Sequence, residues 1–130
     1  MTAKNNSHKM KDEVVIDPVK KLIHITLEGY PDLAETQRGT NELEKNVNLM
    51  PDVAEWAIIV DSTALSTFSP DLLPILKHCY KAIYERFRVA VIVNPTQTVA
   101  NMQLKRIARE TNFSGKFVAT NEEAMKVCFG

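Results

Sequence analysis

The chain has 130 residues, of which 45% are hydrophobic and 25% charged, the composition of an ordinary soluble globular domain. Sixteen basic and sixteen acidic residues cancel, so the molecule has no net charge that would favour nucleic acid or an anionic membrane surface. We therefore expect a single domain without a nucleic-acid partner.

The cysteines and the N-terminal segment bear on the cellular compartment. Cys79 and Cys128 stand outside any CxxC or Cys/His metal spacing, which favours a reducing, cytoplasmic compartment. No stretch approaches the roughly 20 apolar residues of a membrane span. Residues 1–12 are polar and contain no apolar signal region, so we expect a flexible arm followed by one domain over 13–130.

The first elements in chain order are a hairpin and a helix. Two strand-like runs within 13–28 flank Asp17-Pro18, residues that favour a turn, and predict a β-hairpin near a sheet edge. Asp32 and Glu35 resemble a capping box at the start of a helix over about 32–49. The apolar stripe of this helix is thin, and Pro51 ends it.

A buried strand and a long helix come next. The run 55–61 is apolar from Trp56 to Val60, which is typical of a parallel strand covered on both faces. The loop that follows is rich in hydroxyl side chains and leads into a helix over 70–87, with Ser69 as its N-cap and Pro70 as its first residue. Apolar residues recur on this helix at steps of three and four: Leu72, Leu73, Leu76, Cys79, Tyr80, Ile83, Tyr84 and Phe87. The aromatic members of the row are expected in the core, or in a dimer or partner surface if part of the row is exposed.

The remaining segments repeat the alternation of strand and helix. We expect a buried strand over 88–94, a helix over 96–111, a short strand over 116–119 and a last helix after the capping box Thr120–Glu123. The third helix is expected to turn Val99, Met102, Ile107 and Ala108 inward, and the last helix Ala124 and Val127. The order ββαβαβαβα predicts a single α/β domain with a mostly parallel central sheet, flanked by helices and preceded by an N-terminal hairpin.

The loop 61–71 is the leading candidate site, because it lies at the carboxyl end of a strand and the positive end of a helix. A functional interpretation makes it a docking or phosphorylated loop, and the alternative is that its side chains only cap the helix and satisfy loop amides. The next strand-to-helix loop, with Asn94 and Thr96, is expected to lie beside it, so that the two loops together form the floor of one cleft. The candidate residues of the first loop are Asp61, Ser66, Thr67, Ser69 and Asp71.

Motifs of catalysis are missing from the sequence. Neither loop carries the glycines of a phosphate-binding motif, and no second carboxylate or histidine stands at metal-ligand spacing from Asp61. His78 and Cys79 are adjacent on a helix and therefore do not face each other. We therefore predict no catalytic residues, no cofactor and no metal.

Residues 13–129 resemble STAS domains, the sulfate-transporter and anti-sigma-factor-antagonist modules, and within them the SpoIIAA-like or STAS/Sec14-like group. The resemblance is carried by AIIVDSTALSTFSPDLLPIL, RVAVIVN and KFVATNEEAMKVC. It implies a bacterial, non-enzymatic regulatory module that binds a protein partner, such as a regulatory kinase or an anti-sigma-like protein. In this interpretation Asp61 holds the loop, Ser69 caps the helix, and Ser66, Thr67 and Asp71 face the partner.

The chain departs from the motif that this resemblance implies. In anti-sigma antagonists the loop carries Asp-Ser-Ser-Gly, and a partner kinase phosphorylates a serine there. Here the matching stretch is Ser69-Pro70-Asp71-Leu72, so the acceptor position falls on Pro70 or Asp71. Asp71 is then a fixed negative charge or the switch is absent, with Ser66, Thr67 or Ser69 as alternative acceptors. The Sec14-like side of the group implies the alternative of a carrier for a small apolar ligand or lipid, and a homodimer is a further expectation.

Overall fold

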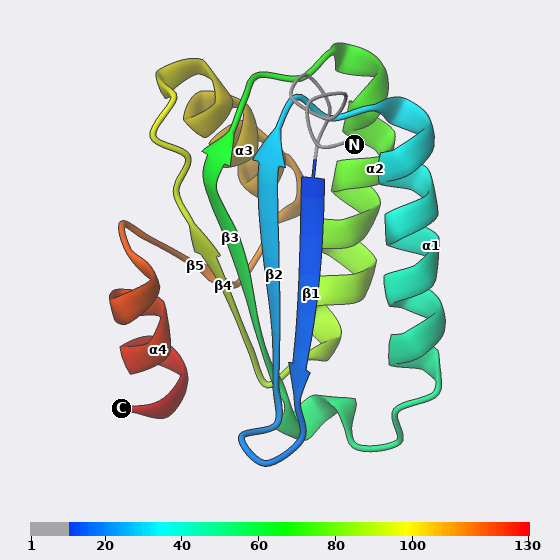
Figure 1. The fold of residues 1–130 in the computed structure, drawn as a ribbon, viewed down its shortest axis with the longest axis vertical. Coiled ribbons are helices and arrows are strands. Elements are labelled where there is room, and N and C mark those ends of the chain that lie inside the picture. Colours follow the sequence, from blue (N-terminus) through cyan, green and yellow to red (C-terminus); the bar gives the residue numbers. More distant parts are fainter. Residues whose placement is uncertain (1–10) are drawn as a thin grey trace, which may run out of the picture.

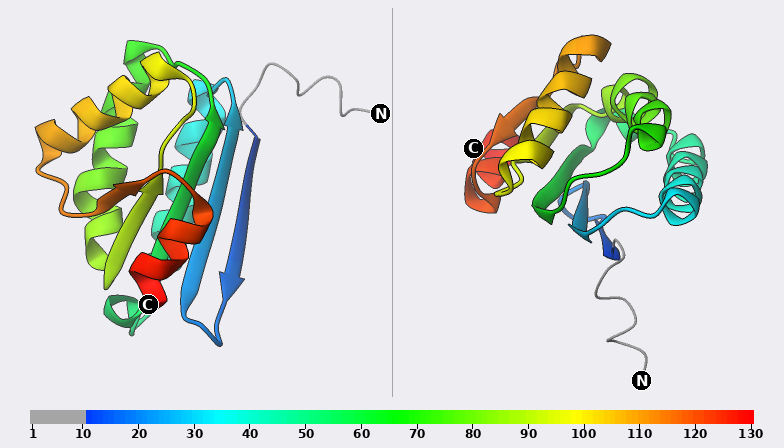
Figure 2. Two further views of the ribbon diagram at one scale, coloured as in Figure 1. Left: turned by 90° about the vertical axis from the view of Figure 1, so that its left-hand side faces the viewer. Right: turned by 90° about the horizontal axis from the view of Figure 1, so that it is seen from above.

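The structure, a computed structural model, describes residues 11–130 and contains one five-stranded sheet with helices on both faces (Figures 1 and 2). The strands lie side by side in sequence order; the first pair is antiparallel and every other pair is parallel. This confirms the predicted α/β class and the N-terminal hairpin. The strands are β1 (Lys11–Asp17), β2 (Leu22–Gly29), β3 (Ala57–Leu65), β4 (Val89–Val93) and β5 (Lys116–Val118).

The hairpin turn forms where the sequence predicts it. The Asp17 carboxylate accepts hydrogen bonds from the N–H groups of Val19 and Lys20 at 3.0 and 3.1 Å, and Lys21 adopts a left-handed φ of 55°. β1 begins at Lys11, inside the predicted arm over 1–12, whose first ten residues lie outside the described part of the chain. β1 forms one edge of the sheet and β5 the other.

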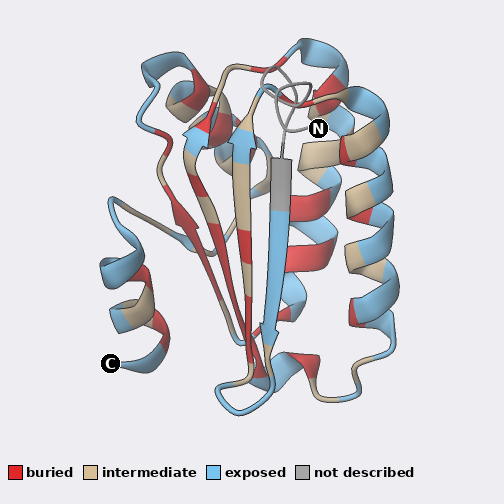
Figure 3. Ribbon diagram, in the orientation of Figure 1, coloured by how far each residue is buried: buried red, intermediate tan, exposed pale blue. Residues whose placement is uncertain are grey.

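The sheet separates two apolar layers. Strands β3 and β4 between these layers are largely buried, whereas β1 is mostly exposed (Figure 3). Along β3, Ile58 and Val60 join the layer that the first three helices cover, whereas Ala57 and Ile59 join the layer beneath the last helix. Each face of β3 is therefore buried, which explains its unbroken apolar run. The helices are α1 (Leu33–Asn48), α2 (Leu73–His78), α3 (Thr98–Thr111) and α4 (Asn121–Phe129), with a short 3₁₀ turn η2 (Val53–Glu55) before β3.

Two helices begin at the expected kind of cap. The Asp32 carboxylate accepts from the N–H of Glu35 at 3.1 Å at the start of α1, and the Thr120 hydroxyl accepts from the N–H of Glu123 at 3.1 Å at the start of α4. The Glu123 carboxylate in turn accepts from the N–H of Ala119 at 2.9 Å. These bonds satisfy amides that have no partner inside the helix.

Helix α3 corrects one prediction about its inward face. It begins at Thr98 after a Gln97 cap and buries Ala100, Leu104 and Ile107, which recur at steps of four and three. Val99 and Met102 were expected to point inward but are 51% and 64% exposed. They lie on a neighbouring face of the helix, because each residue turns the chain by about 100°.

The helix expected over 70–87 changes its winding three times. A 3₁₀ turn η3 (Pro70–Leu72) precedes α2, which continues into a π-helical turn η4 (Cys79–Ile83) and a 3₁₀ turn η5 (Tyr84–Arg86). The changes in winding bring both ends of the π turn against the core. The aromatic row of Tyr80, Tyr84 and Phe87 is 3–7% exposed and belongs to the core rather than to a dimer surface.

Candidate functional site

Strand β3 is longer than predicted, and this moves the start of the candidate loop. β3 runs to Leu65, and its pairing with β2 shifts between Thr26, opposite Asp61, and Glu28, opposite Ala64. This bulge inserts one extra residue into β3. Asp61 is therefore a strand residue, and the connection to η3 is only Ser66–Ser69.

Asp61 anchors β3 to the start of α4. One carboxylate oxygen accepts from the N–H and hydroxyl of Thr63 at 3.0 and 2.5 Å, and the other accepts from the side-chain amide of Asn121 at 2.8 Å. The amide oxygen of Asn121 lies 3.0 Å from Nε2 of His24 on β2. The sequence did not point to Asn121 or His24, since they lie 60 and 97 residues from their partners in this chain of contacts.

The electrostatic balance keeps Asp61 ionised. Partial burial raises the pKa of its carboxyl, but the hydrogen bonds from Asn121 and Thr63 and the proximity of His24 outweigh it, so the pKa lies below the ordinary value. Because both oxygens of the Asp61 carboxylate accept hydrogen bonds within the chain, this residue holds the structure together rather than contacting a partner.

The loop with Asn94 and Thr96 contacts β3 at Thr63, a residue within the predicted loop 61–71. The N–H and hydroxyl of Thr96 donate to the carbonyl of Thr63 at 3.1 and 3.2 Å. The N–H of Asn94 donates to the carbonyl of Val118 at 2.8 Å, and its half-buried side chain has an amide oxygen without a hydrogen-bond partner. Thr96 therefore braces β3 from the neighbouring loop.

We call residues Ser66–Leu72 the docking segment. Phe68 and Leu72 are buried at 4% and 1% exposure and fasten its two ends to the core. Gln103 on α3 holds Phe68 from both sides: its oxygen accepts from the Phe68 N–H at 3.2 Å, and its amide donates to the Phe68 carbonyl at 2.8 Å. The backbone of this connection is thus held by the sheet, by η3 and by α3.

The polar members of the docking segment face outward. Ser69, Pro70 and Asp71 are exposed, and Ser66 and Thr67 are half-buried. Ser69 stands at the N-cap of η3, but its hydroxyl donates to the Asp71 carboxylate instead of accepting from a helix N–H, which corrects its predicted capping role. The carbonyl of Ser69 accepts the first hydrogen bond of the 3₁₀ turn, from the N–H of Leu72 at 3.1 Å.

Two exposed apolar side chains, Val99 and Met102, lie on α3, the helix whose Gln103 contacts the docking segment. Val99 and Met102 stand three residues apart on α3, and Gln103, which holds Phe68, follows directly. Residues at steps of three and four share a helix face. Val99 therefore shares a helix face with Gln103, four residues on, and both Val99 and Met102 offer exposed apolar area on the helix that holds the docking segment.

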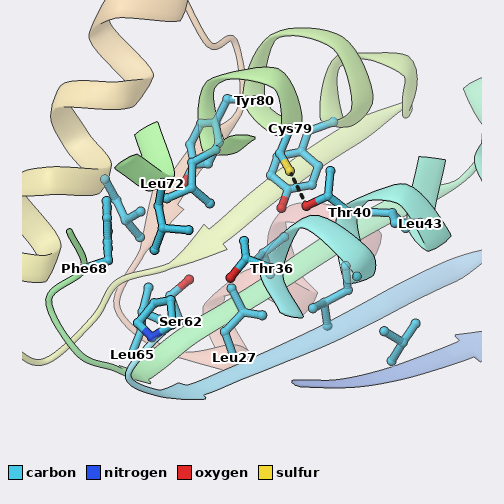
Figure 4. A pocket seen from close by; sticks show the side chains of 18 residues that line it. Leu27, Thr36, Thr40, Leu43, Ser62, Leu65, Phe68, Leu72, Cys79 and Tyr80 are labelled. Carbon is cyan, nitrogen blue, oxygen red and sulfur yellow. Dashed lines mark hydrogen bonds between the residues drawn. The ribbon is translucent and has the colours of Figure 1, made fainter. Parts of the chain in front are cut away.

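A cavity of about 80 Å³ lies between α1, the π turn and the sheet (Figure 4). Its wall includes Leu65, Phe68 and Leu72 from the end of β3 and the docking segment, and Thr36 and Thr40 from α1. A cavity cannot be read from sequence. Thr36 and Thr40 stand four residues apart on α1, the spacing of side chains that share a helix face.

Two negative findings concern the described residues. Within 11–130, no three side chains of the metal-binding types gather into one group. No helix in this part of the chain is long and apolar enough to cross a bilayer.

Comparison with solved structures identifies the class of fold. One match is the crystal structure of an anti-sigma factor antagonist from Mycobacterium paratuberculosis, with a TM-score of 0.59 over 92% of this chain and 96% of that chain. Sequence identity is 16%, so the likeness concerns the fold. The chain therefore has the predicted STAS-like fold. No family model matches the chain, and no curated protein matches it in sequence.

Proposed function

We propose that this chain is a non-enzymatic regulatory module of the bacterial cytoplasm that binds a protein partner through the docking segment, Val99 and Met102. The proposal rests on one observation: three residues hold the backbone of the docking segment in place although part of the segment is exposed. Phe68, Leu72 and Gln103 hold its backbone, while Ser69 and Asp71 stay accessible. A segment ordered before binding loses little conformational entropy when a partner docks.

The composition of this surface fits a small protein interface. Val99 and Met102 supply apolar contact area, and the hydroxyls of Ser66, Thr67 and Ser69 form a polar rim. The likeness to an anti-sigma factor antagonist supports a regulatory partner, such as a kinase or an anti-sigma-like protein.

Asp71 gives the surface a fixed negative charge. The hydroxyl of Ser69 already donates to the Asp71 carboxylate. A phosphate on Ser69 would remove this donor and place two anionic groups side by side, which repel each other. We therefore propose that docking is constitutive and that the partner presents a basic or hydrogen-bond-donating group to Asp71.

The direct test compares partner capture by matched variants. In the triple variant Ser66→Ala, Thr67→Ala and Asp71→Asn, we expect loss of a partner that the wild-type chain retains from its own cells. The control is Glu42→Gln on the exposed side of α1, which also removes one negative charge. A partner that the triple variant retains at wild-type levels contradicts the proposal.

The cavity favours a second candidate function, a carrier for a small apolar ligand. Its wall is mostly aliphatic and aromatic, and it lies between helices and sheet as that function requires. Solvent extraction of the natively purified protein, followed by mass spectrometry, tests this candidate. A stoichiometric small molecule supports it, and an empty protein counts against it.

A further inference from the structure

We propose that the cavity between α1 and the sheet binds a small, uncharged molecule with an apolar body and one hydrogen-bonding oxygen, held by Thr36 and Ser62. The inference rests on the second candidate function and names its class of ligand. It does not depend on the docking segment as a partner surface. A failed ligand test therefore leaves partner docking untouched, and a failed partner test leaves the ligand site untouched.

The first step is the pair of buried hydroxyls. Thr36 on α1 and Ser62 on β3 are 6% and 1% exposed, and neither hydroxyl has a hydrogen-bond partner within the described part of the chain. Both side chains line the cavity, one from the helix and one from the sheet (Figure 4). Buried hydroxyls are nearly always paired, because an unpaired one loses its bonds to water without replacement. A ligand oxygen between them would restore a partner to each.

The second step is the chemistry of the rest of the wall. The other polar side chains of the cavity include Thr40 and Cys79, which hydrogen-bond each other at 3.5 Å between Oγ1 and Sγ. Among the residues that the structure describes, no Lys, Arg, His, Asp or Glu side chain lines the cavity. A charged ligand would lose its hydration with nothing to compensate, so the site selects an uncharged one.

The third step is size and access. At about 80 Å³ the cavity is smaller than the engineered cavity of ~150 Å³ that binds benzene, so it suits a ligand of a few heavy atoms. It is larger than a single water needs, and its aliphatic walls offer water few partners. Val14 on the edge strand lines the cavity and is 50% exposed, so the cavity reaches the surface beside β1.

The fourth step is the π turn. Cys79 and Tyr80 belong to η4 and form part of the wall, and Tyr84 follows directly. π-helical turns are rare and often mark functional sites. Here the wider turn places an aromatic ring and a thiol on the cavity while the helix continues on either side.

The experiment uses the purified full chain and three probes with the same four-carbon body. These are 1-butanol, pentanoate and butylammonium, which all carry a butyl chain and differ in the polar group and its charge. Methyl NMR follows the Ile, Leu and Val groups of the wall, such as Ile25, Val60 and Leu72. We expect saturable shifts of these methyls with 1-butanol, at an affinity on the order of millimolar for so small a ligand, and none with the charged probes.

Two sets of variants locate the binding. The double variant Thr36→Val and Ser62→Ala keeps the shape of the cavity and removes both hydroxyls, and we expect it to weaken 1-butanol binding by about tenfold or more. It should also raise the melting temperature of the empty protein, because two unpaired hydroxyls are gone. Gly39 lines the cavity from α1, so Gly39→Leu should abolish binding, whereas Gly39→Ala as the matched control should retain it.

The outcomes decide the proposal. Binding of 1-butanol that depends on Thr36 and Ser62 and is lost in Gly39→Leu supports it. The absence of saturable shifts, as expected if only water occupies the cavity, overturns it. So does equal binding of the charged probes, or unchanged binding in the double variant.

Discussion

At the scale of single residues, Asp61 illustrates how a carboxylate inside a long strand holds neighbouring elements together. Both of its oxygens accept hydrogen bonds, from Thr63 within β3 and from Asn121 at the start of α4. Its exposed neighbours Ser69 and Asp71 are bonded to each other and remain accessible. The Asp61 carboxylate therefore holds β3 in place, whereas the Asp71 carboxylate stays accessible on the docking segment.

The lowered pKa of Asp61 has a consequence for acid stability. The folded state holds the carboxyl ionised more strongly than the unfolded state, so its contribution is present above the ordinary pKa of 3.8 and lost as pH falls through the lower folded value. We expect Asp61→Asn to cost about 1 kcal/mol at pH 7, the value for a charged hydrogen bond reduced for partial exposure. Urea unfolding at pH 7 and pH 2 measures this. The deficit should shrink at the lower pH, and a deficit that is equal at both pH values contradicts the assignment.

Two glycines are expected to respond to alanine in opposite directions. A Cβ on Gly115 would stand 2.5 Å from the carbonyl oxygen of Ala90 and would also strike the Phe113 ring, so Gly115→Ala should cost about 2 kcal/mol by overpacking. Gly39 lies inside α1 beside the cavity, and Gly39→Ala should stabilise by about 0.5–1 kcal/mol through helix propensity. Chemical denaturation of both variants checks the signs. If Gly115→Ala left the free energy of unfolding unchanged, the turn after α3 would have to move aside for the added methyl group, and the predicted overpacking would be wrong.

At the scale of elements, the docking segment depends on α3 for its order. The two hydrogen bonds between Gln103 and the backbone of Phe68 join segments that are 35 residues apart. Such a clamp lowers the conformational freedom of the segment before any partner arrives.

Gln103→Ala tests this clamp without touching an exposed residue of the docking segment. We expect faster hydrogen exchange at the Phe68 amide, because its acceptor is lost, and weaker partner binding from a less ordered segment. Gln37→Ala is the matched control, since Gln37 bonds only Asn41 on the exposed side of α1. Unchanged partner affinity in Gln103→Ala would show that the order of the segment is irrelevant to docking.

The elements also show what the sequence could and could not predict. Strong local signals placed the hairpin at Asp17-Pro18, the caps Asp32 and Thr120, and the buried strand after Trp56. The end of β3 was missed because the bulge after Asp61 depends on pairing with β2, which no local pattern of hydroxyl residues reveals.

Features that depend on tertiary contacts were missed in the same way. The winding changes after His78 were not predicted, since the apolar spacing of Tyr80 and Tyr84 fits a regular helix as well as a π turn. The cavity and its hydroxyls arise only when α1 packs over β3. Thr36 and Ser62 are short polar residues that look like surface positions in the sequence.

At the scale of the whole molecule, the sheet has one apolar open edge. Val14, Val15 and Ile16 on β1 are each about half exposed, and within residues 11–130 β1 pairs with β2 alone. Open edges of this kind invite pairing with a second strand. The predicted homodimer thus has a candidate surface at β1, whereas the buried aromatic row offers none.

Sedimentation velocity over a range of protein concentrations tests whether β1 pairs with a second copy of the chain. We expect reversible self-association of the wild-type chain that Val15→Lys weakens, because a charge in the middle of an edge strand opposes pairing. Val19→Lys introduces the same charge in the hairpin turn, where Val19 is 93% exposed, and should leave the association unchanged. A wild-type chain that stays monomeric at every concentration contradicts this use of β1.

The measurement that tests the central claim most directly is native mass spectrometry of the protein purified from its own cells, in parallel with the triple variant of Ser66, Thr67 and Asp71. The account predicts a stoichiometric complex with a protein partner for the wild-type chain, no phosphate on the docking segment, and loss of the partner in the triple variant. A partner bound equally to both chains, or a wild-type chain without any protein partner, would contradict docking through this segment.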